Sequence, residues 1–177
     1  MNEKLGLLHV YHGDGKGKTT AAMGLALRAL GCGCRVIVAQ FLKDGDSGEL
    51  NAFQAFNNVQ ILSGKCVKGF TFTMTDQQKQ SVSEEMLERF HYIVQRCEQG
   101  TCDLVVLDEL LDAVNCGLLP WEEVYCFLRQ RPENIEVIVT GRNPRPELQE
   151  LADYITEMKK IKHPYDRGIS ARKGVEF

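Results

Sequence analysis

The chain alternates between short apolar runs and longer segments whose apolar residues recur at helical spacing. The short runs are rich in Val, Ile and Leu and predict strands at residues 6–11, 35–41, 59–62, 103–107, 136–140 and 154–158. The longer segments predict helices at residues 19–30, 49–56, 75–99, 119–130 and 146–152. Apolar strands separated by helices are typical of a parallel sheet covered by helices on both faces. The pattern therefore predicts an α/β fold.

Residues 162–177 differ from the rest of the chain because Pro164, Gly168 and Gly174 interrupt any periodic pattern. This stretch predicts an irregular C-terminal arm or lid. Its charge is also distinct: residues 158–177 contain six Lys or Arg and two acidic residues, whereas the whole chain has a net charge of −3. A basic segment on an acidic body indicates a local anion site, and we expect no nucleic-acid partner.

The overall composition is that of a globular protein, with 44% hydrophobic and 25% charged residues. A length of 177 residues fits one domain, so we expect residues 1–177 to form a single unit. No stretch has the ~18 consecutive apolar residues of a membrane-spanning helix, and the first residues do not resemble a signal peptide. Seven cysteines occur without the spacing of a disulfide framework. These features predict a cytoplasmic protein with no membrane partner.

The clearest chemical motif is the segment His12-Gly13-Asp14-Gly15-Lys16-Gly17-Lys18-Thr19-Thr20. It follows a predicted strand and begins a predicted helix, which is the context of a phosphate-binding loop, or P-loop. Glycines let successive backbone N–H groups face phosphate oxygens, and the helix N-terminus adds positive charge. The common pattern has glycine where this chain has His12, and here Gly13 follows one position later.

This motif predicts a site for the phosphates of a nucleotide. The loop residues predicted to contact the nucleotide are Gly13, Asp14, Gly15, Lys16, Gly17, Lys18, Thr19 and Thr20. Lys18 would supply a mobile cation to the phosphates, and the hydroxyl of Thr19 is placed to bind Mg²⁺.

Two carboxylates, Asp108 and Glu109, follow the apolar strand predicted at residues 103–107. A carboxylate at the carboxyl end of a strand near a P-loop can bind Mg²⁺ directly or through water. We therefore predict a metal site formed by Thr19, Asp108 and Glu109. In a hydrolase Glu109 would instead activate water, and a carboxylate here can also serve only to stabilise a helix N-terminus.

Further segments accompany the loop along the chain. They are Gln40-Phe41-Leu42-Lys43, Gly69-Phe70-Thr71-Phe72, Val106-Leu107-Asp108-Glu109-Leu110, Thr140-Gly141-Arg142-Asn143, Thr156-Glu157-Met158, Lys162-His163-Pro164 and Ala171-Arg172-Lys173-Gly174-Val175-Glu176. In this order they resemble the P-loop family of ATP:cob(I)alamin (corrinoid) adenosyltransferases, of the cob(I)yrinic acid a,c-diamide adenosyltransferase type. The resemblance covers residues 6–177 and implies a three-layer, RecA-like P-loop NTPase fold.

The resemblance also implies a reaction. In this family the loop holds the triphosphate of ATP, the Co(I) centre of a corrinoid attacks the ribose 5′-carbon, and tripolyphosphate leaves. The implied substrates are a corrinoid and ATP, with Mg²⁺ as cofactor, a donor of electrons to cob(II)alamin as partner, and a homodimer as the assembly. The chain shows no Ser/His/Asp or Cys/His arrangement, which fits a reaction whose substrate supplies the nucleophile.

Four residues are implied to be catalytic: Lys18, Arg142, Phe70 and Phe72. Lys18 and Arg142 would neutralise the departing phosphates. Arg142 follows the strand predicted at residues 136–140 and should therefore project near the P-loop, although a solvated loop arginine also fits this position. Phe70 and Phe72 share one face of an extended segment. The resemblance implies that they bind the lower face of the corrinoid and displace its axial ligand, although two phenylalanines at this spacing also fit a hydrophobic core.

Two other classes of protein fit the same motifs. A P-loop kinase or ATPase acting on another substrate would use Asp108 and Glu109 equally well. A corrinoid carrier or ATP sensor would bind the ligands without turnover. The products separate these classes, because a kinase or ATPase releases ADP and adenosyl transfer releases intact tripolyphosphate.

Overall fold

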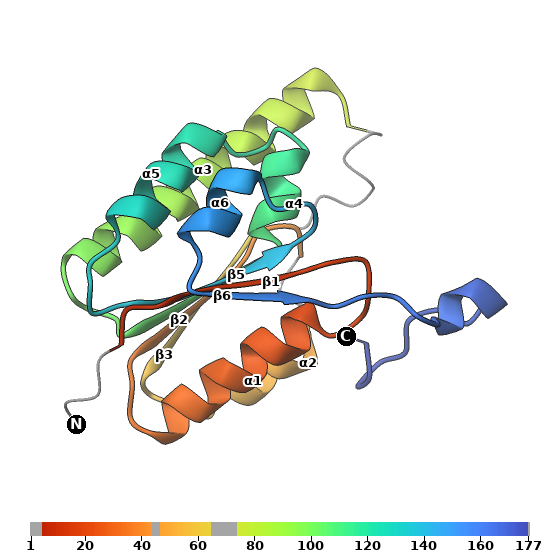
Figure 1. The fold of residues 1–177 in the computed structure, drawn as a ribbon, viewed down its shortest axis with the longest axis horizontal. Helices are drawn as coiled ribbons and strands as arrows, with labels where there is room; N and C mark the ends of the chain where they lie inside the picture. The colour runs from red at the N-terminus through yellow and green to blue at the C-terminus, as the bar shows by residue number, and fades with distance from the viewer. Residues whose placement is uncertain (1–4, 44–46, 65–73, 177) are drawn as a thin grey trace.

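The computed structural model describes residues 5–43, 47–64 and 74–176. Its centre is a six-stranded sheet in which every pair of neighbouring strands is parallel, in the order β3-β2-β4-β5-β1-β6 (Figure 1). The strands are β1 (Leu8–His12), β2 (Val36–Gln40), β3 (Val59–Ser63), β4 (Leu104–Asp108), β5 (Glu136–Gly141) and β6 (Tyr154–Glu157).

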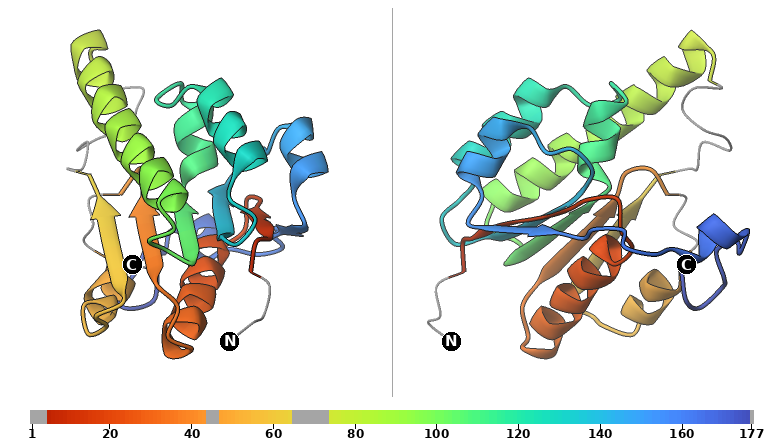
Figure 2. Two further views of the ribbon diagram at one scale, coloured as in Figure 1. Left: turned by 90° about the vertical axis from the view of Figure 1, so that its left-hand side faces the viewer. Right: turned by 45° about the vertical axis from the view of Figure 1, so that its right-hand side comes forward.

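Helices cover both faces of this sheet, as the two views of Figure 2 show. One face carries α1 (Lys18–Gly31) and α2 (Gly48–Phe53). The other carries α3 (Asp76–Glu98), α4 (Leu110–Asn115), α5 (Trp121–Gln130) and α6 (Pro146–Leu151). The predicted α/β fold with a parallel sheet and helices on both faces is confirmed.

Two apolar layers hold the helices on the sheet. Beneath α1 and α2, residues such as Ala22, Ala26 and Phe53 pack against Val38 and Val106 of the central strands. The opposite layer is larger and contains side chains from α3, α4, α5 and α6. Burial of each Leu, Ile or Phe side chain in these layers contributes about 1.5–3 kcal/mol to the free energy of folding. The packed sheet therefore supports the loops at its edge.

The sequence pattern missed one helix and one feature of the last strand. The helix α4 has only six residues and follows Asp108 directly, so it adds no separate helical period to the apolar pattern. All four residues of β6 are exposed because this strand lies at the edge of the sheet, where the helices do not cover it. In the predicted irregular arm, residues Pro164–Arg167 form one turn of 3₁₀-helix.

The strand order decides which residues meet at the carboxyl edge of the sheet. Gln40 at the end of β2 is opposite Asp108 at the end of β4, and His12 at the end of β1 is opposite Gly141 at the end of β5. In open parallel sheets ligands bind beyond the carboxyl ends of the strands. The loops after β1, β2, β4 and β5 therefore converge on one region. No helix in the three described ranges is long and apolar enough to cross a membrane.

Candidate active site

The glycine-rich loop connects β1 to α1 and is fastened to the chain that follows β6. The backbone N–H of Met158 donates to the carbonyl of His12 at 2.7 Å, and the N–H of Gly15 donates to the carbonyl of Met158 at 2.6 Å. The backbone N–H of Lys160 then donates to the Asp14 carboxylate at 2.9 Å. The loop is thus held from the side as well as at its two ends.

This close approach explains why two positions of the loop are occupied by glycine. A Cβ atom on Gly13 or Gly15 would lie 2.5 or 2.6 Å from the carbonyl oxygen of Met158, which is far inside van der Waals contact. Gly13 also has a φ of 114°, in the region that favours glycine. The loop can therefore lie against Met158 only if both positions lack a side chain.

We expect Gly15→Ala to destabilise the loop. The added methyl group must push the backbone of residue 15 away from Met158, and overpacking of this kind costs about 1–3 kcal/mol. Chemical denaturation should report this loss in the free energy of unfolding, together with weaker ATP binding. The matched control is Gly24→Ala on the exposed face of α1, where a Cβ meets nothing within 4 Å and helix propensity predicts a slight gain in stability. Equal stability of the two variants would contradict this account of the loop.

The loop opens onto a cavity of about 690 Å³ at the carboxyl edge of the sheet. Its lining includes most of the residues predicted to bind nucleotide or metal: Gly15, Lys16, Gly17, Lys18, Thr19, Thr20, Glu109 and Arg142. The structure brings these together from three separate parts of the chain. Gly13 and Asp14 face the segment after β6 instead, where they anchor the loop.

Lys18 is the first residue of α1, and its ammonium bends back over the loop. It donates to the carbonyl oxygens of Gly13 and Gly15, each at 2.8 Å. Burial lowers the pKa of Lys18 from its usual value, and the positive charge of Arg142 adds to that shift. The ammonium is therefore poorly solvated and is close to where a bound phosphate would meet the loop.

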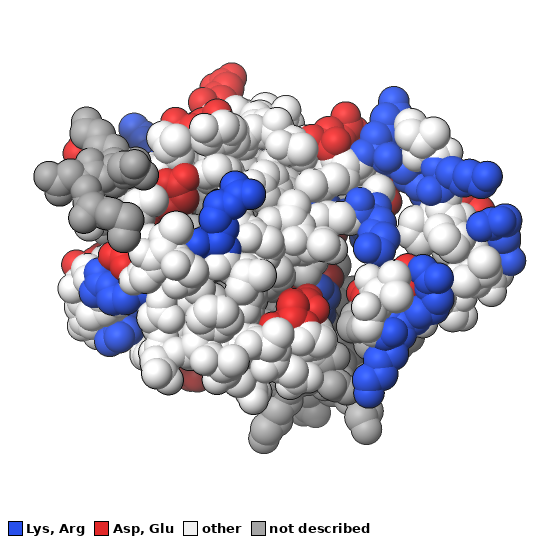
Figure 3. Space-filling view, turned by 90° about the horizontal axis from the view of Figure 1, so that it is seen from below, with Lys and Arg blue, Asp and Glu red and all other residues white. Residues whose placement is uncertain are grey.

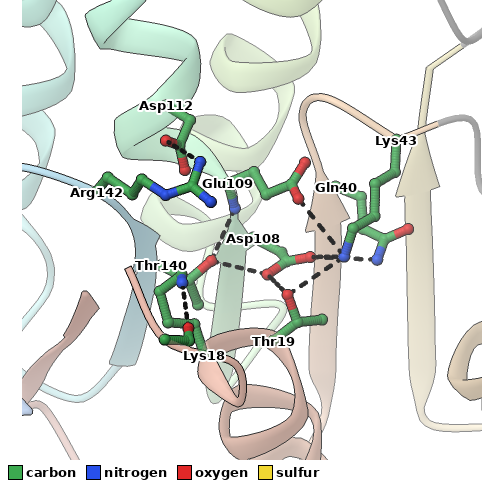
Figure 4. A network of polar contacts seen from close by, with 10 residues as sticks. Lys18, Thr19, Gln40, Lys43, Asp108, Glu109, Asp112, Thr140 and Arg142 are labelled. Carbon is green, nitrogen blue, oxygen red and sulfur yellow. Dashed lines mark hydrogen bonds and ion pairs between the residues drawn. The ribbon is translucent and has the colours of Figure 1, made fainter. Parts of the chain in front are cut away.

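Asp108 is the centre of a polar network (Figure 4). Its side chain is fully buried. One oxygen, Oδ1, accepts the hydroxyl hydrogens of Thr19 and Thr140, both at 2.8 Å. The other, Oδ2, accepts from Nζ of Lys43 at 3.0 Å and from Nε2 of Gln40 at 3.3 Å. Four side chains, from α1, β5, β2 and the loop after β2, thus fix the orientation of this carboxylate.

Glu109 joins this network through its backbone, because its N–H donates to the hydroxyl oxygen of Thr140 at 2.8 Å. Its backbone adopts a left-handed conformation with a φ of 60°, which is uncommon for a residue other than glycine and is typical of functional sites. Burial raises the pKa of Glu109, and the nearby Asp108 adds to the shift while Lys43 opposes it. Its Oε1 is 3.8 Å from Nζ of Lys43.

Arg142 faces Asp112, a residue of α4, across the mouth of the cavity. Their charged groups are 3.9 Å apart, and the Arg142 side chain is 59% exposed. Burial raises the pKa of Asp112, although Arg142 and Lys18 act against this effect. Arg142 is therefore loosely held and free to turn toward an anion in the cavity.

The C-terminal arm closes one side of the cavity, because His163, Gly174, Val175 and Glu176 line it. Arg172 hydrogen-bonds to Glu176 at 2.9 Å and lowers the pKa of that carboxyl to about 2. Figure 3 shows positive side chains gathered at the end of the molecule where Figure 1 places this arm. The predicted basic arm is thus part of the cavity wall.

Sequence reasoning did not predict a role for four polar residues around Asp108 and Arg142: Gln40, Lys43, Asp112 and Thr140. Thr140 could have been found from its position at the end of a predicted strand, by the same argument that found Asp108. Asp112 lies on the helix that the apolar pattern did not predict. Phe70 and Phe72, predicted to bind a corrinoid, lie outside the described residues.

The oxygen donors around Asp108 suit a hard cation such as Mg²⁺. They include the hydroxyl of Thr19 and the carboxylates of Asp108 and Glu109. Oε1 of Gln40 is also buried here and has no hydrogen-bond partner among the described residues. Within the same residues no group of three or more His, Cys, Asp or Glu could hold a metal ion. A Mg²⁺ ion would therefore need phosphate oxygens as further ligands, as in most nucleotide sites.

Two solved structures share this fold. One comprises ATPases 2 and 3 of EssC from Geobacillus thermodenitrificans, with a TM-score of 0.51 and 15% identity over 96% of this chain. The other is the cytoplasmic domain of EssC, with a TM-score of 0.56 and 18% identity over 95% of this chain. This chain spans 35% and 34% of those longer chains. The likeness supports the predicted three-layer α/β fold.

Several corrinoid adenosyltransferases are similar in sequence to almost the whole of this chain. Corrinoid adenosyltransferases from Escherichia coli K12 and Pseudomonas aeruginosa are 36% and 38% identical, and each match covers 99% of this chain and 87% or 85% of the relative. The corrinoid adenosyltransferase CobA of Salmonella typhimurium is 35% identical, covering 99% of this chain and 87% of the relative. The family model of ATP:corrinoid adenosyltransferase BtuR/CobO/CobP matches residues 4–177. This chain therefore belongs to the ATP:corrinoid adenosyltransferase family.

Proposed function

We propose that this protein transfers the 5′-deoxyadenosyl group of ATP to the Co(I) centre of a corrinoid and releases tripolyphosphate. The observation that carries the proposal is the cavity itself, in which the P-loop, Lys18 and Arg142 surround a space suited to a triphosphate. Family membership separates this activity from that of a kinase or ATPase with the same loop.

The reaction requires little covalent chemistry from the protein, because the bonds change between cobalt and ATP. The electron pair of Co(I) forms the Co–C bond, the bond between C5′ and the α-phosphate oxygen breaks, and that oxygen leaves with the tripolyphosphate. The protein must hold C5′ in line with cobalt and stabilise the charge that develops on the leaving oxygen. The loop N–H groups and Lys18 supply this stabilisation, and Arg142 turns inward from Asp112 to add a second cation.

Mg²⁺, when bound, would neutralise part of the triphosphate charge. We assign its protein ligands to Thr19, Asp108 and Glu109. The side chains of Thr19 and Asp108 are already in contact at 2.8 Å, and Oε1 of Glu109 is 3.8 Å from the Lys43 ammonium that contacts both. Thr140 and Gln40 hold the carboxylate of Asp108 in one orientation, so its oxygens need no reorganisation when the cation arrives.

The corrinoid side of the site remains assigned through resemblance. Phe70 and Phe72 are proposed to contact the lower face of the corrinoid, and an external electron donor is proposed to reduce its cobalt. The arm at residues 162–177 is proposed to act as a lid, which is supported by the four arm residues that line the cavity.

Identification of the phosphate product tests the proposed function. Incubation of the protein with Mg-ATP and chemically reduced cobalamin, without oxygen, should give the spectrum of an adenosylated corrinoid and an equal amount of tripolyphosphate. Omission of the corrinoid should abolish ATP consumption. ADP formation that does not depend on the corrinoid would favour the kinase or ATPase alternative.

A further inference from the structure

Lys43 occupies the point at which the proposed metal ligands converge. Its Nζ is 3.0 Å from Oδ2 of Asp108 and 3.2 Å from the hydroxyl oxygen of Thr19. Oε1 of Glu109 is 3.8 Å away on another side. All three residues predicted from the sequence to bind Mg²⁺ therefore face the ammonium group of one lysine, as Figure 4 shows.

There is a physical reason for a positively charged group, the ammonium of Lys43, at this point. Asp108 is fully buried, and a buried carboxylate without a cation is strongly disfavoured. Burial of Lys43 alone would lower its pKa, but the attraction of Asp108 and Glu109 raises it above the usual value. Lys43 is thus a charged lysine that neutralises the site from within the chain.

A metal ion and Lys43 cannot use the same oxygens at once. Both oxygens of Asp108 are engaged, one by Thr19 and Thr140 and the other by Lys43 and Gln40. A cation that binds between Thr19 and Asp108 must therefore displace the ammonium. Lys43 has room to move because its side chain is 30% exposed and lines the cavity, as does Glu49 of α2.

We propose that Lys43 is a resident cation that exchanges with Mg²⁺, a role that rests on the proposed function of Thr19 and Asp108 as metal ligands. In the free protein Lys43 neutralises Asp108 and opposes binding of a divalent cation alone. With ATP and Mg²⁺ bound, Lys43 would leave the Asp108 carboxylate to the metal and turn to the triphosphate within the cavity. The exchange couples the two ligands, so metal binds well only together with nucleotide.

Binding of Mn²⁺ alone, measured by electron paramagnetic resonance without nucleotide or corrinoid, tests the exchange. A neighbouring opposite charge changes the proton affinity of a carboxylate by about 10- to 1,000-fold. We accordingly expect Lys43→Met to bind Mn²⁺ at least ~10-fold more tightly than the unaltered protein. The matched control is Lys79→Met on the exposed surface of α3, which removes the same charge and should leave Mn²⁺ affinity unchanged.

A second measurement separates exchange from a merely structural role. Lys43→Met should have a lowered melting temperature because Asp108 loses its cation, and Mn²⁺ alone should restore it. Lys43→Gln keeps a hydrogen-bond donor at this position without charge, and serves if the Met variant does not fold. Equal Mn²⁺ affinity in the variants and the unaltered protein, or a melting temperature that Mn²⁺ does not raise, would overturn the proposal.

Asp108→Asn distinguishes failure of this inference from failure of the proposed metal site. If this variant binds Mn²⁺ and ATP together as tightly as the unaltered protein, the assignment of the metal site is wrong, and the proposed exchange is refuted with it. If Asp108→Asn weakens that binding while the Lys43 variants gain no affinity for Mn²⁺ alone, the metal site stands and only the exchange is refuted.

Discussion

Replacement of Lys18 by alanine is expected to lower kcat/KM for adenosyl transfer by about 10²–10³-fold, because one preorganised charged contact to the leaving group is lost. In the free protein the ammonium rests on the carbonyls of Gly13 and Gly15, 2.8 Å from each. These contacts are replaceable by water, so the fold should survive. Steady-state kinetics with reduced cobalamin and circular dichroism of the variant provide the measurement.

Lys16→Ala is the control for this prediction. Lys16 belongs to the same loop and lines the same cavity, but it is exposed, so solvent screens its charge. We expect a smaller loss of activity than for Lys18→Ala. Wild-type kinetics in Lys18→Ala, or equal losses in both variants, would show that the bend of Lys18 over the loop has no special part in the reaction.

Asp108→Asn should lower activity by at least ~100-fold at low Mg²⁺, since it removes the buried charge that holds the proposed metal. The shape of the side chain is kept, and the amide oxygen can still accept from Thr19 and Thr140. The amide NH₂ group replaces the oxygen that accepted from Lys43 and Gln40, so Lys43 loses this acceptor. Added Mg²⁺ should restore part of the activity, because the metal affinity and not the architecture has changed. Titration of activity with Mg²⁺ measures the shift.

Glu109→Gln serves as the comparison. The Glu109 carboxylate is 3.8 Å from Nζ of Lys43 and lacks the direct contact to Thr19 that Asp108 makes, so a smaller shift in Mg²⁺ dependence is expected. A shift as large as that of Asp108→Asn would make Glu109 an equal metal ligand. An unchanged Mg²⁺ dependence in Asp108→Asn would refute the assignment of Asp108.

Sequence reasoning predicted the parts of this site that depend on local pattern. The P-loop is a continuous motif, and Asp108 ends an apolar run, so both are visible along the chain. Lys43 could not be placed in this way, because its contact with Asp108 requires β2 to lie beside β4. Strand order is a property of the whole sheet, and no nearby residue encodes it.

The difference between local and long-range information also explains which helices the sequence could predict. Long helices such as α3 carry several turns of apolar period and a capping box at Thr75, so their bounds were predicted within a residue. The six residues of α4 carry less than two turns. Because the sequence pattern did not predict α4, it also gave no reason to consider Asp112, which lies on this helix. A functional residue on a short helix is therefore difficult to predict from sequence.

The place of β1 between β5 and β6 affects how the protein is made on the ribosome. Leu8 pairs with Val137 and His12 with Glu157, so the P-loop emerges early but its partners emerge near the end of synthesis. At about 5–20 residues per second, the nascent loop waits several seconds for Met158. The P-loop therefore gains its backbone contacts with Met158 only after most of the chain has been made.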